Sequence, residues 1–117
     1  MVKILIADDD HVMLGLIRTL MELEGNEVVT ATRPEDIVPA VKNEDLAMIL
    51  MDYHLAGGNS IAALKELKSD PNLKNIPILV ASGMDREYEC LTAGADGFLL
   101  KPFRPAELLD RIGEFIQ

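Results

Sequence analysis

Short apolar runs alternate along this chain with segments whose apolar residues recur at helical spacing. The strand-like runs cover residues 3–7, 27–31, 47–51, 78–81 and 97–100. Between and after them, spacings of three and four residues predict helices over 12–23, from Pro34 onward, over 60–68, over 85–92 and from Pro105 onward. This alternation predicts an α/β fold built from repeated strand–helix units.

The runs at 3–7, 47–51 and 78–81 are almost entirely apolar, which is typical of strands buried on both faces. We therefore expect a doubly wound parallel sheet of five strands, with five helices packed on its two faces. Pro39 lies inside the second predicted helix and should kink or shorten it. Because no linker, repeat or low-complexity tract interrupts the pattern, we expect one domain over residues 1–117.

Composition narrows the possible partners. The chain has 117 residues, of which 49% are hydrophobic, and no apolar run is long enough to span a bilayer. Its start resembles no export signal, so we expect a cytoplasmic protein without a membrane partner. The net charge of −9, with basic residues scattered along the chain, argues against direct nucleic-acid binding. The single cysteine, Cys90, is expected to be a partly buried helix residue without a functional role.

Polar residues follow four of the apolar runs, at the point where each run ends. They are Asp8, Asp9 and Asp10 after the first run, then Asp52, Ser82 and Lys101. The carboxyl ends of parallel strands meet at one edge of a sheet, where such folds bind ligands. Carboxylates gathered there repel one another unless a cation lies among them, and oxygen ligands of this kind suit Mg²⁺. A carboxylate beside such an ion could attack a phosphoryl group and form an aspartyl phosphate.

These residues also carry a resemblance to a known family. Asp8-Asp9, Asp52, Ser82, Phe98 and Lys101-Pro102, in this order, resemble the receiver domain of two-component response regulators, of the chemotaxis-regulator type. The resemblance covers the whole chain. It implies a flavodoxin-like sheet of strand order 2-1-3-4-5, in which the first and third strands meet at the ligand site.

The resemblance also implies a metal and a phosphoacceptor. Asp52 would accept the phosphoryl group and contribute to Mg²⁺ binding. Asp9 would bind the ion directly, and Asp8 would assist partly through water. The main-chain carbonyl of His54 would be the remaining protein ligand.

The remaining site positions imply a switch rather than an enzyme acting on other molecules. Lys101 would pair with the phosphoryl group, and Lys101-Pro102 would be a cis peptide. Ser82 would bond another phosphoryl oxygen, and Phe98 would turn in response. The donor would be a histidine kinase or a histidine phosphotransfer protein. The output would be a downstream protein or domain, or a homodimer, reached through the surface of the helix at 85–92, the strand at 97–100 and the last helix.

The loop after Asp52 departs from the family pattern. Leu55, Ala56 and Ser60 stand where methionine, proline and glycine are usual. Gly57 and Gly58 can still supply the backbone freedom of a sharp turn, so we expect the site to survive with an altered loop.

Two other interpretations remain open. The chain could be a pseudo-receiver that has kept the fold as a binding module without phosphotransfer. It could also be a phosphatase of the haloacid-dehalogenase class, since Asp8 and Asp10 form an Asp-x-Asp pattern after the first strand, and Asp8 would then be the nucleophile. On the receiver interpretation, Asp10 is instead a helix cap or a solvated residue.

Overall fold

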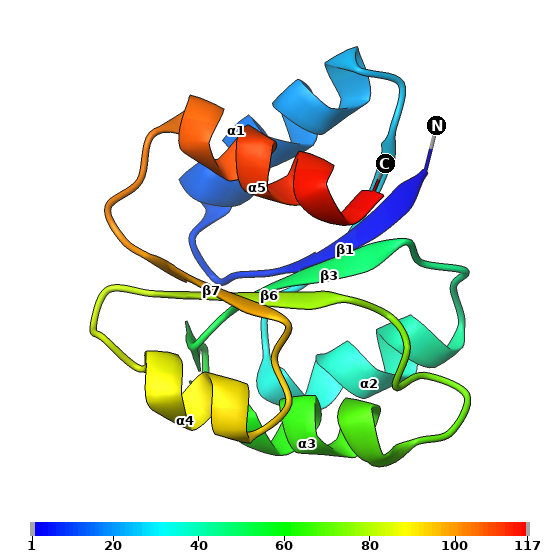
Figure 1. Ribbon diagram of the computed structural model, residues 1–117. Coiled ribbons are helices and arrows are strands. Elements are labelled where there is room, and N and C mark those ends of the chain that lie inside the picture. Colours follow the sequence, from blue (N-terminus) through cyan, green and yellow to red (C-terminus); the bar gives the residue numbers. More distant parts are fainter. Residues whose placement is uncertain (1, 117) are drawn as a thin grey trace.

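The computed structural model describes residues 2–116 and consists of a central sheet with helices on both faces (Figure 1). The elements are, in chain order, β1 (Lys3–Ala7), α1 (His11–Leu23), β2 (Glu27–Ala31), α2 (Pro34–Lys42), β3 (Met48–Asp52), β4 (His54–Leu55), β5 (Gly58–Asn59), α3 (Ile61–Ser69), β6 (Ile78–Ser82), α4 (Glu87–Thr92), β7 (Gly97–Leu100) and α5 (Pro105–Ile116).

The main sheet has five strands in the order β2-β1-β3-β6-β7, and every neighbouring pair is parallel. Because β4 and β5 lie outside this sheet, the order is the predicted 2-1-3-4-5, and the predicted fold class is confirmed. The chain switches direction across the sheet between β1 and β3. The crevice at such a switch point is where open α/β sheets bind ligands.

Two apolar clusters lie on opposite faces of the sheet. Helices α1 and α5 cover one face, and α2, α3 and α4 cover the other (Figure 1). Strand β1 serves both, because Ile4 and Ile6 join the cluster under α1 and α5, whereas Leu5 and Ala7 join the opposite one. Burial on both faces explains why this strand is a continuous apolar run.

Strands β4 and β5 form a two-stranded antiparallel pair that the sequence did not predict. Ala56 and Gly57 form the turn, and Gly58 begins β5. Gly57 and Gly58 have φ of 94° and 156°, which residues with a side chain rarely adopt. The altered loop after Asp52 is therefore a short hairpin, and Gly57 and Gly58 supply the backbone freedom that it needs.

Helix α4 is shorter than predicted and begins at Glu87 instead of Asp85. The side chain of Asp85 accepts a hydrogen bond from the Glu87 N–H at 3.1 Å, so the residues before Glu87 form a local turn in place of a helical one. Cys90 on this helix is fully buried, where the sequence predicted partial burial.

Helix α2 contains Pro39 and ends at Lys42, which agrees with the shortened helix expected there. Within residues 2–116, no helix combines the length and the apolar character needed to cross a membrane.

Candidate functional site

Three aspartates meet at the carboxyl ends of β1 and β3. The parallel register pairs Ala7 with Met51, so the following residues, Asp8 and Asp52, lie side by side. Together with Asp9, each contributes a carboxylate oxygen, and these oxygens lie within 4.8 Å of one another. Asp8 is buried, Asp52 is partly buried and Asp9 is exposed. The predicted gathering of carboxylates at this edge is therefore present.

Hydrogen bonds with the backbone give Asp8 and Asp10 different roles. The N–H of Asp8 donates to the carbonyl of Ala31 at 3.0 Å, and Asp8 Oδ1 accepts from the Asp10 N–H at 3.0 Å. Asp10 caps α1, because its Oδ1 accepts from the N–H groups of Val12 and Met13 at 3.0 and 3.2 Å. Asp10 is thus a helix cap, as the receiver interpretation predicts.

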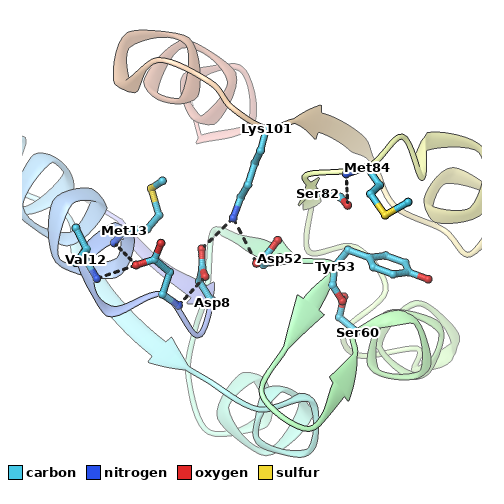
Figure 2. Close-up of polar contacts among 10 residues, drawn as sticks. Asp8, Val12, Met13, Asp52, Tyr53, Ser60, Ser82, Met84 and Lys101 are labelled. Atoms are coloured by element: carbon cyan, nitrogen blue, oxygen red, sulfur yellow. Dashed lines mark hydrogen bonds and ion pairs between the residues drawn. The ribbon is translucent and has the colours of Figure 1, made fainter.

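Lys101 brings a positive charge to the cluster from the end of β7. Its Nζ lies 3.3 Å from Asp52 Oδ2 and 3.6 Å from Asp8 Oδ2 (Figure 2). Its backbone N–H donates to the carbonyl of Ser82 at 2.7 Å, and the Lys101–Pro102 peptide bond is cis, as expected. One ammonium group therefore pairs with two of the three carboxylates, and the cluster keeps an excess of negative charge.

The electrostatics of Asp52 favour a further cation. Burial raises the pKa of Asp52 to about 6, from an ordinary value of 3.8. The charge of Lys101 opposes this rise, whereas the carboxylates of Asp8 and Asp9 add to it. Closely spaced oxygen donors with uncompensated negative charge fit a hard divalent ion such as Mg²⁺.

Ser82 and Phe98 lie on the next two strands, β6 and β7. Asp52 pairs with Ala81 in the register of β3 and β6, so Ser82 follows directly at the same edge. Ser82 is fully buried, and its Oγ accepts from the Met84 N–H at 3.1 Å. Phe98 is half-buried on β7 and packs against the cluster that α2, α3 and α4 cover.

His54 lies on β4 and is exposed, with its ring edge-on to Tyr53 at a centroid distance of 4.7 Å. No motif or spacing in the sequence singled out Tyr53. Its hydroxyl donates to Glu89 Oε1 on α4 at 3.0 Å. Glu89 lies 36 residues further along the chain, so sequence spacing does not relate the two residues. The position of Tyr53 directly after Asp52 was the one sequence feature that could have pointed to a functional role for it.

A cavity of about 380 Å³ opens beside the cluster, lined by Asp10, Met13, Gly83, Lys101, Pro102 and Phe103. A larger groove of about 730 Å³ lies between α2, α3 and the β4–β5 hairpin, and no residue of the aspartate cluster lines it. The smaller cavity is the one that adjoins the charged groups.

Curated proteins similar to this chain include signalling regulators. The transcriptional regulatory protein CpxR homolog of Haemophilus influenzae is 34% identical over 115 residues, which cover 96% of this chain and 49% of that protein. Chemotaxis protein CheY-3 of Vibrio cholerae is 28% identical over 119 residues, covering 98% of this chain and 92% of that protein. The chain spans between 18% and 49% of the length of the first curated relatives that it matches.

A similar solved structure is the receiver domain of sensor histidine kinase PA1611 from Pseudomonas aeruginosa, with a magnesium ion coordinated in its active site cleft. It has a TM-score of 0.86 at 26% identity, and the match covers 98% of this chain and 97% of that one. The family model of the response regulator receiver domain matches residues 4–113. With the sheet order and the aspartate cluster in agreement, the chain belongs to the response regulator receiver domain family of two-component systems.

Proposed function

We propose that this chain is a phosphorylation-dependent signalling switch, in which Asp52 accepts a phosphoryl group from the phosphohistidine of a histidine kinase or histidine phosphotransfer protein. The observation that carries the proposal is the convergence of Asp8, Asp9 and Asp52 with Lys101 at one sheet edge. This arrangement provides a nucleophile, oxygen ligands for an ion and a cation for the phosphoryl oxygens.

Asp52 is the nucleophile. One of its carboxylate oxygens attacks phosphorus, the new P–O bond forms as the P–N bond breaks, and the bonding electron pair stays on the donor's histidine nitrogen. With a pKa of about 6, Asp52 is mostly ionised at pH 7 and can attack. Hydrolysis of the aspartyl phosphate regenerates Asp52, so the chain catalyses only its own phosphorylation and dephosphorylation.

The neighbouring groups bind and orient the phosphoryl group. Asp8, Asp9, Asp52 and the backbone carbonyl of His54 would hold Mg²⁺. When bound, the ion supplies positive charge that offsets the charge of the phosphoryl oxygens. Lys101 already lies 3.3 Å from Asp52 Oδ2, so its ammonium can pair with an oxygen of the group that Asp52 acquires. The cavity bordered by Lys101 gives the donor histidine a route to the site.

The response would leave through α4, β7 and α5. Ser82 Oγ accepts a hydrogen bond from its own loop, and after phosphorylation its hydroxyl would donate to a phosphoryl oxygen. That movement makes room for Phe98 to turn inward and carries the Gly83 loop and α4 with it. A phosphoryl group can shift this equilibrium only by the free energy of its differential contacts with the two states. The partner that binds this surface would be a downstream protein or domain, or a second copy of the chain.

Phosphorylation in vitro tests the proposal directly. The protein is incubated with acetyl phosphate and Mg²⁺, and the modified residue is mapped by mass spectrometry after reductive trapping. We expect modification at Asp52, lost in Asp52→Asn and in the presence of a chelator. Modification that persists in Asp52→Asn, or that maps to Asp8, would contradict the proposal and favour the phosphatase interpretation.

A further inference from the structure

Tyr53 connects the residue after Asp52 directly to α4. Its side chain is only 4% exposed, and its hydroxyl donates to Glu89 Oε1 at 3.0 Å. Both backbone polar groups of Tyr53 are hydrogen-bonded, because its N–H donates to the carbonyl of Ala81 at 2.8 Å and its carbonyl accepts from the Ser60 N–H at 3.0 Å. The ring points away from Asp52 and Lys101 (Figure 2). The hydroxyl therefore belongs to the rigid sheet edge, while its partner belongs to a helix on the far side of the Gly83 loop.

Arg86 completes this contact. Its guanidinium carbon lies 5.1 Å from the centroid of the Tyr53 ring, a distance typical of a cation–π contact. Arg86 Nη1 lies 3.8 Å from Glu89 Oε1, so the arginine contacts both the ring and the carboxylate that the ring's hydroxyl binds. We call Tyr53, Arg86 and Glu89 the α4 anchor.

Helix α4 has little else within its own length to hold it. It has six residues, of which only Cys90 is buried, and the side chain of its N-cap residue Arg86 makes no capping hydrogen bond. At its start, the side chain of Asp85 accepts a hydrogen bond from the Glu87 N–H. Isolated helices this short are unstable in water, so the position of α4 depends on its tertiary contacts. Tyr88 and Leu91 on the same helix are exposed and add little packing. Besides the packing of α4 against β7, the α4 anchor is therefore a specific side-chain contact that holds this helix in place.

One donor of the anchor is left without a partner. Arg86 Nε is buried and has no hydrogen-bond acceptor among the described residues. A buried unsatisfied donor costs free energy, so an arrangement of α4 in which Nε gains an acceptor would relieve that cost. The α4 anchor thus combines a hydrogen bond that holds α4 in place with an unsatisfied donor, Arg86 Nε, whose free-energy cost favours a different position of the helix.

We propose that the hydrogen bond between Tyr53 and Glu89, supported by Arg86, holds α4 in its resting position and opposes the phosphorylation-dependent shift. The inference rests on the proposed function, since it concerns the same switch. A contact present only in the resting state lowers the population of the responsive state and weakens the apparent affinity for any group that selects it. Removing the contact therefore strengthens binding of the activating group.

Beryllofluoride, which stands in for the phosphoryl group on Asp52, provides the test. Its affinity in saturating Mg²⁺ is measured by amide chemical shifts for the wild type, Tyr53→Phe and the matched control Tyr88→Phe. Tyr88 lies on α4 and is 85% exposed, so losing its hydroxyl should change nothing. We expect Tyr53→Phe to bind beryllofluoride about three- to tenfold more tightly, within the range of ordinary coupling between sites. Its affinity for Mg²⁺ alone should stay unchanged, because the aspartates are intact.

Glu89→Ala removes the same hydrogen bond from the other side and does not alter the residue next to Asp52. Both single variants should tighten binding, and the double variant should match the tighter single variant, because each deletes the same contact. Unchanged or weaker binding in Tyr53→Phe, equal tightening in Tyr88→Phe, or additive effects in the double variant would each overturn the inference. If the wild type itself fails to bind beryllofluoride with Mg²⁺, the proposed function falls and the anchor's role falls with it.

Discussion

Lys101 places its ammonium nitrogen 3.3 Å from Asp52 Oδ2, yet the pKa of Asp52 remains raised to about 6. Burial of Asp52 and the charges of Asp8 and Asp9 together outweigh the lysine. Without a bound ion, the negative charge of the three carboxylates at this sheet edge is thus only partly neutralised. The free energy stored in this way is available to a ligand that brings positive charge to the cluster.

Asp52→Asn should stabilise the metal-free protein at neutral pH. An acid whose pKa is higher in the folded state, about 6 against 3.8, binds its proton more tightly when folded, so its contribution to stability falls as pH rises through this interval. Asparagine has no such charge. We expect the free energy of unfolding of the Asp52→Asn variant to exceed that of the wild type by about 1–3 kcal/mol at pH 7.5 in the presence of a chelator, with a smaller difference near pH 4.5. Urea denaturation at both pH values measures this.

Magnesium supplies the internal control for that experiment. Because the ion binds the folded wild type through the carboxylates, adding it should narrow the gap between the wild type and Asp52→Asn. A variant that is less stable than the wild type at pH 7.5 in a chelator would show that the pairing with Lys101 outweighs the burial of Asp52.

Asp9 and Asp10 are adjacent aspartates with opposite expected consequences. Asp9→Ala should weaken Mg²⁺ binding by at least about tenfold while the fold stays intact, because it removes a ligand oxygen. Asp10→Ala should keep the Mg²⁺ affinity but lose about 1 kcal/mol of stability, because it removes the cap of α1. Amide shifts during a Mg²⁺ titration, together with urea denaturation, separate the two. Equal loss of affinity in both variants would contradict these roles.

The gathering of the aspartates could be predicted because it depends on backbone topology. Apolar runs that end in Asp8 and Asp52 become neighbouring buried strands, and their register then places the two carboxylates side by side. The same reasoning placed Ser82 and Lys101 at this edge. Sequence order and strand type suffice for such positions, since each residue is fixed within one step of a strand end.

Features that depend on side-chain direction or on local competition were not predicted. Helix α4 starts late because the Asp85 side chain takes the N–H of Glu87, and periodicity does not reveal such a turn. The β4–β5 pair has only two residues in each strand, too few for an alternating pattern. The hydrogen bond between Tyr53 and Glu89 joins positions 36 residues apart that neither motif nor spacing relates.

Lys101→Met should raise the pKa of Asp52 above its present value of about 6. The ammonium lowers this pKa, so replacing it with a neutral side chain of similar length leaves burial and the two neighbouring carboxylates unopposed. A carbon-detected NMR titration of the Asp52 carboxyl group, without Mg²⁺, gives the value directly. An unchanged or lower pKa would mean that the pairing seen at 3.3 Å has no electrostatic weight in solution.

Ser82→Ala should uncouple the phosphoryl site from the response. In the wild type, beryllofluoride with Mg²⁺ should shift the amide resonances of Phe98 and of α4 as well as those of the aspartates. Without the Ser82 hydroxyl the site can still bind the ligand, but the loop that leads to α4 can no longer form a hydrogen bond to it. The chemical-shift changes at Phe98 and α4 should therefore be smaller. Ser60→Ala is the matched control, because Ser60 is equally buried but lies beside α3.

Ser82→Ala and Ser60→Ala change residues on different sides of Asp52, so comparing them identifies the route of the signal. Ser82 ends β6 and its Oγ is bonded into the loop before α4, whereas Ser60 precedes α3 and its Oγ is directed at the Tyr53 carbonyl at 3.5 Å. A signal that passes through the β6 loop should be reduced by Ser82→Ala alone. If the wild-type shifts never extend beyond the aspartates, or if both variants reduce them equally, the proposed route to α4 is wrong and the pseudo-receiver interpretation gains support.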